Sequence, residues 1–347
     1  MTARPHPHQP EQGCPMLVIV GSTATGKSAL AVFLAESLGG EVVNFDSMQL
    51  YRGFNIGTGK LSPGERRGIP HHLLDIVDPG QVFTAGDYAR EAERMLVFLR
   101  EKGSLPILVG GTGLYLRTLL LGLFEGPGRS EELRARLKRV AHRRSREFLH
   151  RMLRRMDPQS AARIHPRDTQ KTIRALEVCV LTRRPFSSML AQGRAGLQGF
   201  RAIKIGLNPD REELNRRIEA RVEAMFNAGL MDEARALFES RALSSHSESP
   251  REGPFTSLGY PQALAAARGE LSREDAIRET QAATRRYAKR QRTWFRRELD
   301  VNWFAGFGDD PAIQREVIDW LAGASLNSRS TAAEVGRTMA GSMISET

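Results

Sequence analysis

Eight residues near the N-terminus form the pattern that most constrains how this chain folds. They match G-x-x-x-x-G-K-[ST] in full, between a short apolar run at 16–20 and an amphipathic run at 28–38. Between a strand and a helix, this pattern is a phosphate-binding loop, because backbone N–H groups and the helix N-terminus attract phosphate oxygens. The residues of the expected loop are Gly21, Ser22, Thr23, Ala24, Thr25, Gly26, Lys27 and Ser28.

The last two loop residues carry the expected chemistry. Lys27 is expected to neutralise phosphate charge, and the Ser28 hydroxyl is expected to ligate Mg²⁺. The loop indicates phosphate rather than ATP, because an ATPase also needs an Asp at the end of a second apolar strand. The best candidate strand, at 105–109, is followed by Gly110 and Gly111 instead. A glycine there allows another chain or a ligand to approach the backbone closely.

The apolar pattern predicts an α/β fold with a parallel sheet. Short apolar runs at 16–20, 41–45, 105–109 and 201–207 alternate with helical patterns. Residues 130–190 instead show helical periodicity and many arginines. We therefore expect a P-loop parallel-sheet core with an inserted all-helical domain. The predicted boundaries are a disordered leader at 1–15, a core at 16–127 and 200–322, a basic helical insertion at 128–199 and a disordered tail at 323–347.

The charge balance predicts a polyanionic partner. Lys and Arg number 51 against 40 Asp and Glu, a net charge of +11, which favours nucleic acid, although a basic but inert surface is an alternative. The two cysteines, Cys14 and Cys179, form no disulfide framework, so we expect a reducing cytoplasm. No apolar run approaches the roughly 18 residues of a membrane span, and we expect no membrane association.

Asp46 directly follows the second expected strand. The carboxyl ends of parallel strands face the ligand crevice. A carboxylate there has three possible roles: it holds Mg²⁺, it accepts a proton from a nucleophile, or it caps a turn or helix. Position alone leaves all three open.

An ordered set of segments resembles the tRNA dimethylallyltransferase family, also called tRNA isopentenyltransferase. After the phosphate loop, the matching segments are 46–53, 57–60, 70–75, 109–115, 170–177, 217–221, 259–260, 287–291 and 293–296. The resemblance covers residues 16–305. The phosphate loop alone is unspecific, whereas the ordered set is highly specific.

The resemblance implies transfer of a dimethylallyl group from dimethylallyl diphosphate to N6 of adenosine 37, beside the tRNA anticodon. It implies that Asp46 accepts the N6 proton, and that Lys27, Mg²⁺ and an arginine stabilise the leaving diphosphate. That arginine is expected to be Arg221 first and Arg217 second. The two are four residues apart, so both also fit a solvent-facing side of an amphipathic helix.

The resemblance also implies a set of tRNA contacts. The tRNA partner is expected to bind through its anticodon stem-loop to a monomeric enzyme, and its target base has to leave its stack. The implied contact residues are Asp46, Ser47, Met48, Gln49, Thr112, Arg134, Gln170, Lys171, Thr172, Ile173, Arg174, Gly259 and Tyr260.

Two other functions fit parts of the sequence. A small-molecule P-loop kinase explains the loop and Asp46 but not the basic helical segment, and an RNA-binding protein with an inactive site is opposed by the intact loop. His71 and His72 are expected to be structural rather than metal ligands. Trp294 and Trp303 are expected to lie in the core.

Overall fold

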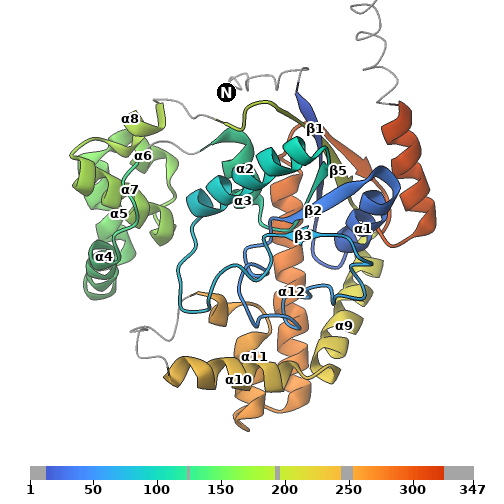
Figure 1. Ribbon diagram of the computed structural model, residues 1–347. Coiled ribbons are helices and arrows are strands. Elements are labelled where there is room, and N and C mark those ends of the chain that lie inside the picture. The colour runs from blue at the N-terminus through green and yellow to red at the C-terminus, as the bar shows by residue number, and fades with distance from the viewer. Residues whose placement is uncertain (1–12, 123–125, 192–195, 244–252, 324–347) are drawn as a thin grey trace, which may run out of the picture. The chain divides into compact units, whose positions relative to one another are not determined.

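The computed structural model describes residues 13–122, 126–191, 196–243 and 253–323. Its strands form one six-stranded sheet in the order β3-β2-β4-β1-β5-β6, in which every pairing is parallel (Figure 1). The strands are β1 (Cys14–Gly21), β2 (Gly40–Asn44), β3 (His71–His72), β4 (Leu105–Val109), β5 (Phe200–Leu207) and β6 (Val301–Phe304). The predicted fold class is confirmed.

Chain contacts divide the protein into two compact units. One comprises the chain up to Arg117 and from Gly199 onward, and the other is Thr118–Gln198. The helices of the first unit are α1 (Lys27–Leu38), α2 (Ala85–Lys102), α9 (Arg211–Asn227), α10 (Leu230–Leu243), α11 (Tyr260–Ala267) and α12 (Arg273–Phe295), with α3 (Gly113–Leu121) crossing the boundary. A short 3-10 helix, Pro254–Thr256, and a helix at 311–323 complete this unit.

The second unit is all-helical among the residues described. Its helices are α4 (Glu131–Arg143), α5 (Arg146–Met156), α6 (Pro158–Arg163), α7 (Thr169–Thr182) and α8 (Phe186–Ala191). Leu149, Leu153 and Leu176 lie at the centre of its own apolar core. This unit starts ten residues before the boundary predicted at 128, because it includes the C-terminal part of α3.

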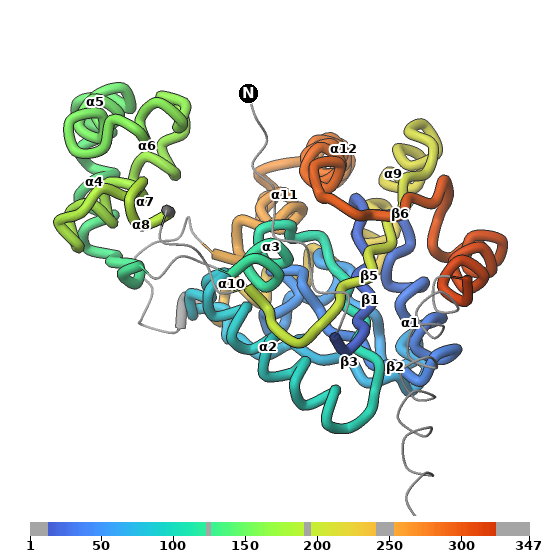
Figure 2. The backbone as a smooth tube through the Cα atoms, turned by 90° about the horizontal axis from the view of Figure 1, so that it is seen from above, coloured from blue at the N-terminus to red at the C-terminus, as the bar shows by residue number. Residues whose placement is uncertain are grey.

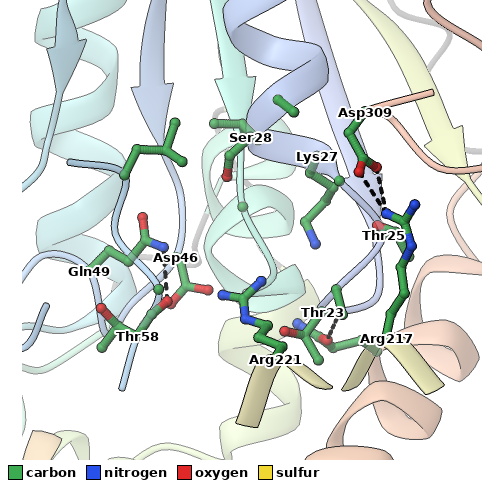
Figure 3. A pocket seen from close by; sticks show the side chains of 18 of the residues that line it. Thr23, Thr25, Lys27, Ser28, Asp46, Gln49, Thr58, Arg217, Arg221 and Asp309 are labelled. Carbon is green, nitrogen blue, oxygen red and sulfur yellow. Dashed lines mark hydrogen bonds and ion pairs between the residues drawn. The ribbon is translucent and has the colours of Figure 1, made fainter. Parts of the chain in front are cut away.

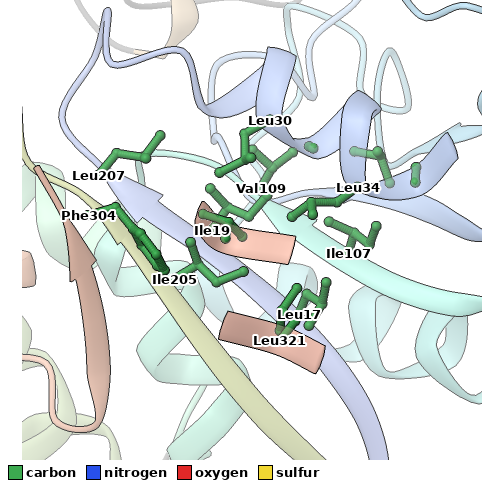
Figure 4. Close-up of a cluster of buried hydrophobic side chains, with 14 of the residues drawn as sticks. Leu17, Ile19, Leu30, Leu34, Ile107, Val109, Ile205, Leu207, Phe304 and Leu321 are labelled. Carbon is green, nitrogen blue, oxygen red and sulfur yellow. The ribbon is translucent and has the colours of Figure 1, made fainter. Parts of the chain in front are cut away.

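One large apolar cluster covers a face of the sheet. Leu30 and Leu34 of α1 pack on β1 and β4, while Val317 and Leu321 of the helix at 311–323 join the same cluster (Figure 4). Val18 and Val20 alternate with the cluster residues of β1 and are also buried, so both faces of the sheet are covered. This burial explains why the central strands are continuous apolar runs.

The ends of the strands differ from prediction in one respect. Cys14 and Pro15, expected to belong to the leader, are part of β1 and pair with Phe200 and Arg201 of β5. Pairing of β1 with β4 begins only at Leu17. Pro15 therefore has a strand neighbour on one side alone, where its missing N–H group is tolerated. The rest of the predicted leader, at 1–12, and almost all of the predicted tail, at 324–347, lie outside the described residues.

Helix α12 is the long element that reaches the site. It packs against α9 and α11 and also contacts β1. Figure 1 shows it as one long continuous helix, and Figure 2 shows it nearly end-on beside α9. Its first turn is capped by Ser272, whose side chain accepts a hydrogen bond from the Asp275 N–H. One helix therefore connects the sheet to the α10–α11 layer.

Candidate active site

The phosphate loop has the predicted conformation between β1 and α1. Gly26 has a φ of 79°, a left-handed conformation that favours glycine, and any Cβ there would lie 2.6 Å from the Asp309 carboxylate. The Thr25 hydroxyl donates to the Ser22 carbonyl at 2.9 Å, and Lys27 Nζ donates to the same oxygen at 2.6 Å. These hydrogen bonds join the first and last parts of the loop to each other at the start of α1.

Two cavities meet beside this loop. The first, of about 390 Å³, is lined by the loop together with Asp46, Arg217 and Arg221. The second, of about 360 Å³, is lined by Met48 and by residues of α9, of the segment 253–259 and of α12. The residues that line both cavities are Thr23, Asp46, Thr58, Arg221 and Tyr287.

Asp46 lies at the junction of the two cavities, opposite Lys27 and Arg221 (Figure 3). Its Oδ1 accepts a hydrogen bond from the Met48 N–H at 3.0 Å, so the turn-capping role considered for this residue is present. A carboxylate offers about four acceptor positions, so the turn leaves capacity for a ligand. Burial raises the pKa of Asp46, although the Met48 N–H and the charges of Lys27 and Arg221 oppose the rise.

The cations beside Asp46 are held in a dry environment. Burial lowers the pKa of Lys27 to about 8, an effect that Asp46 opposes and Arg221 increases. Arg221 has no ion-pair partner within the described ranges, and its guanidinium points towards Asp46 (Figure 3). An anion that enters the first cavity thus meets two cations that are not neutralised by a close partner.

Arg217 has a different environment from Arg221. Its Nη1 donates to both carboxylate oxygens of Asp309 at 2.6 and 2.8 Å, and its guanidinium lies 3.7 Å from the centre of the Phe307 ring. Both arginines line the first cavity, so neither is simply a solvent-facing residue of α9.

Hydrogen bonds to Glu233 hold the loop that brings Thr58 and Gly59 to the first cavity. Glu233 of α10 accepts hydrogen bonds from the Asn55, Ile56 and Gly57 N–H groups, and the Tyr260 hydroxyl donates to the same carboxylate at 2.7 Å. A Cβ at Gly59 would lie 1.9 Å from Arg221 Nη2, so only glycine allows the loop to approach the arginine. Glu233 is a residue that the sequence analysis missed, because its partners lie about 180 positions away.

The expected tRNA contacts fall into two groups. In the first unit, Asp46, Ser47, Met48 and Gly259 line the second cavity, Gln49 lines the first, and the Thr112 hydroxyl donates to Ser47 Oγ. The expectation that the Tyr260 side chain contacts tRNA has to be corrected. This side chain is fully buried and hydrogen-bonded to Glu233, so it is unavailable to RNA and supports the loop at 55–57 instead.

In the second unit, the expected contacts lie on α4 and α7. Gln170 and Lys171 are exposed, whereas Thr172 and Ile173 are buried, so the side chains of those two residues support the helix core rather than contact RNA. Arg134 and Arg174 both donate to the buried Glu177 carboxylate at 2.8 Å. Their guanidinium groups are thus partly committed to holding this unit together.

The other aromatic and histidine predictions have mixed outcomes. His72 Nε2 lies 2.7 Å from Glu41 Oε2, a structural contact at the start of β2. Trp303, expected in the core, is 38% exposed on the edge strand β6, where it packs over Gly206. Trp294 is half-buried and stacks under Arg117.

The phosphate loop lies beside a carboxylate at the end of β2, and glycines stand in place of an acid after β4. These features define the class of P-loop α/β proteins. A family model described as IPP transferase matches residues 49–298. The tRNA dimethylallyltransferase of Solibacter usitatus is 53% identical over 308 residues, which cover 89% of this chain and 98% of the relative. The chain therefore belongs to the tRNA dimethylallyltransferase family, and it is a transferase that prenylates tRNA.

Solved structures agree with this assignment. The full-length tRNA isopentenylpyrophosphate transferase of Bacillus halodurans is 35% identical, with a TM-score of 0.65 over 92% of this chain and 99% of that one. A eukaryotic dimethylallyltransferase acting on tRNA is 28% identical, with a TM-score of 0.74 over 89% of this chain and 80% of that one. The described residues contain no helix long and apolar enough to cross a membrane.

Proposed function

We propose that the protein transfers the dimethylallyl group of dimethylallyl diphosphate to N6 of adenosine 37, next to the tRNA anticodon. The observation that carries this proposal is the position of Asp46 where the two cavities meet, opposite Lys27 and Arg221. The phosphate-loop cavity is the donor site, and the second cavity admits the adenine.

The chemistry requires one bond to form as another breaks. The N6 lone pair attacks C1 of the dimethylallyl group, and the C1–O bond breaks as its electron pair leaves with diphosphate. The N6 proton passes to the Asp46 carboxylate, whose raised pKa makes it a better base than an exposed carboxylate. Charge that develops on the leaving oxygens is stabilised by Lys27 and Arg221, since both are close and largely desolvated.

The surroundings suit these two substrates. Met48, Val222, Met225 and Leu258 give the second cavity an apolar wall, which favours a prenyl chain and a flat base over a charged ligand. Arg221 is the preferred diphosphate ligand, because Arg217 is already engaged by Asp309. The adenine must be extruded from its stack to enter, which costs least in a single-stranded loop.

The residues present also fit a magnesium ion. Ser28, Asn44 and Asp46, which all carry side-chain oxygen atoms, line the same cavity, and Mg²⁺ prefers oxygen ligands that include substrate phosphates. Ser28 would hold the ion, which would supply further charge neutralisation to the diphosphate. We further propose that the enzyme acts as a monomer in the cytoplasm.

The proposal is tested by nucleoside analysis of tRNA after reaction. Protein, Mg²⁺ and dimethylallyl diphosphate are incubated with an unmodified tRNA transcript that carries adenosine 37, and with a transcript in which guanosine replaces that base. N6-dimethylallyladenosine from the first transcript and none from the second is expected. Equal prenylation of both transcripts would contradict the assigned position, and donor hydrolysis without modified nucleoside would contradict the acceptor.

A further inference from the structure

The side chain of Gln291 in α12 is 5% exposed, and both ends of its amide are hydrogen-bonded. Its Oε1 accepts from the Thr23 N–H at 2.8 Å, and its Nε2 donates to the Gly111 carbonyl at 2.9 Å. Thr23 follows β1 and Gly111 follows β4, so a single side chain joins the ends of two neighbouring strands to one helix. The orientation of the amide is determined, because only Nε2 can donate to a carbonyl.

Glycines after β4 make this approach possible. A Cβ at Gly111 would lie 2.2 Å from Gln291 Nε2, and a Cβ at Gly113 would lie 2.0 Å from Trp294 Nε1. Distances this short are not tolerated between packed atoms. Gly111 and Gly113 thus leave room for α12, whereas a Cβ at Gly110, directly after β4, would lie 2.5 Å from the Phe45 backbone.

The contact has a direct consequence for the phosphate loop. The Thr23 N–H is committed to Gln291, so it cannot also donate fully to a phosphate oxygen. Thr23 itself lines both cavities beside Asp46. Tyr287, one turn earlier on α12, lines both cavities as well, and Arg290 lines the second. The helix face that holds the loop is therefore also a wall of the site.

We propose that Gln291 is a positioning residue, which fixes the phosphate loop at Thr23 and so sets where the diphosphate lies relative to Asp46. The inference rests on the proposed donor site. Gln291 lines the first cavity, but both ends of its amide are engaged by backbone groups, so its role is exerted through the Thr23 amide and the Gly111 carbonyl. The hydrogen bond to the Gly111 carbonyl is buried and the one from the Thr23 N–H is partly buried, so leaving these backbone groups unpaired is costly.

Two substitutions separate the hydrogen bonds from side-chain volume. Gln291→Met keeps a similar volume and loses both bonds, so donor affinity is expected to fall about tenfold at every pH. Gln291→Glu, when ionised, cannot donate to Gly111 and adds negative charge beside an anion site. When protonated, it has one O–H donor and one carbonyl acceptor, which restores both bonds. Burial raises the pKa of such a carboxyl, so protonation is reached at mildly acidic pH.

The measurement is calorimetric binding of dimethylallyl diphosphate with Mg²⁺ at pH 5.5 and pH 8, expressed as the ratio of variant to wild-type affinity at each pH. For Gln291→Glu the deficit is expected to be at least about tenfold at pH 8 and to shrink several-fold at pH 5.5. Gln281→Glu is the matched control: Gln281 lies on α12 and donates to the Glu219 carbonyl, and its affinity ratio should stay near one at both pH values.

Each outcome decides between distinct claims. Wild-type affinity in both Gln291 variants, or a Gln291→Glu deficit that does not change with pH, would overturn the positioning role. If Gln291→Met fails to fold, the pH dependence of Gln291→Glu decides alone, because its low-pH form has the native bonds. Absence of donor binding by the wild type would overturn the donor-site assignment together with this inference, whereas wild-type binding with unaffected variants overturns the inference only.

Discussion

Asp46 and Lys27 face each other across the donor cavity, and burial displaces their pKa values in opposite directions. Burial penalises whichever form is charged, so the pKa of Asp46 rises and that of Lys27 falls to about 8. The proposed reaction requires Asp46 to be ionised as a base and Lys27 to be protonated for the diphosphate. Under this proposal the two groups define the pH window for transfer.

A bell-shaped pH profile is the first expected consequence. We predict that kcat/KM for the donor rises as pH passes through the elevated pKa of Asp46 and declines as pH passes through about 8, where free Lys27 loses its proton. Lys27→Arg should remove the decline on the basic side, because the guanidinium stays charged. A wild-type profile that is flat from pH 7 to 9.5 would contradict this assignment of Lys27.

Asp309 is the second residue-scale prediction. Its carboxylate lies in the donor cavity and holds Arg217 in an ion pair whose side chains are 38% and 45% exposed. Such a pair is worth at most about 1 kcal/mol. Asp309→Asn should release Arg217 and remove a negative charge, so the donor Kd should fall about fivefold.

The control for Asp309 is Asp300→Asn, which removes the same charge at an exposed position before β6. Binding of labelled donor is measured for both variants. Unchanged or weaker donor binding in Asp309→Asn would show that the ion pair does not compete with the diphosphate.

The phosphate loop from Gly21 to Ser28 was predictable from its motif and strand context alone. The strand context also placed Asp46 at the site, but it left three roles open, and only the family resemblance favoured one of them. Tyr260, by contrast, was expected at the RNA surface and is buried, because its partner Glu233 is contributed by another helix. Pairings between distant segments leave no periodic signal, which is also why Gln291 and Asp309 received no role.

At the scale of elements, one carboxylate organises the loop that supports Arg221. Glu233→Gln replaces one acceptor oxygen with a donor that faces backbone N–H groups, so stability should fall by about 2 kcal/mol. Transfer should also slow, because Thr58 and Gly59 would no longer be held against the site. Denaturant unfolding and transfer rates measure the two effects.

Tyr260→Phe supplies the comparison for Glu233→Gln, since it removes only one of these bonds and should cost about 1 kcal/mol. The double variant should lose less than the sum of the two, because both residues act on one network. If the losses of stability in the two single variants add up fully in the double variant, Glu233 and Tyr260 do not act in one hydrogen-bond network.

The helical unit at 118–198 is stabilised by a buried acid. Burial alone would raise the pKa of Glu177, but hydrogen bonds from Arg134, Arg174 and the Ser130 N–H outweigh it and lower the pKa to about 2. Because the folded pKa lies below the unfolded value, the stabilisation of about 3 kcal/mol is complete above about pH 4.5 and is lost as pH falls towards 2.

Hydrogen exchange of residues 126–191 tests this prediction. Protection should drop as pH is lowered from 5 to 2, after correction for the intrinsic exchange rate, and Glu177→Gln should show reduced protection already at pH 7. Glu132→Gln, exposed on α4, should match the wild type. Equal protection in the two variants at pH 7 would contradict a structural role for Glu177.

Elements were predictable where strands are long and buried. β1, β2, β4 and β5 lie within or close to the predicted ranges, since a strand covered on both faces is an uninterrupted apolar run. β3 and β6 were missed because they are short strands at the two edges of the sheet, with polar or exposed residues. The stretch at 242–254 is rich in serine and polar residues, which predicts a loop, and it lies largely outside the described residues.

At the scale of the whole molecule, the net charge of +11 suits a polyanionic substrate, and family membership identifies that substrate as tRNA. The sequence could not show how closely the two cavities meet, because their linings come from eight separate stretches of chain. In the proposed reaction Asp46, at the point where the cavities meet, takes the proton from the acceptor.

Single-turnover transfer by Asp46→Asn tests that central claim most directly. Enzyme in excess of tRNA is mixed with labelled dimethylallyl diphosphate, and donor and tRNA affinities are measured separately. The amide keeps the size of the side chain and an acceptor for the Met48 N–H but is not a base, so the transfer rate should fall at least about 100-fold while both affinities change less than about fivefold. A near-wild-type rate, or a loss explained wholly by weaker binding, would contradict the assignment of Asp46 as the proton acceptor.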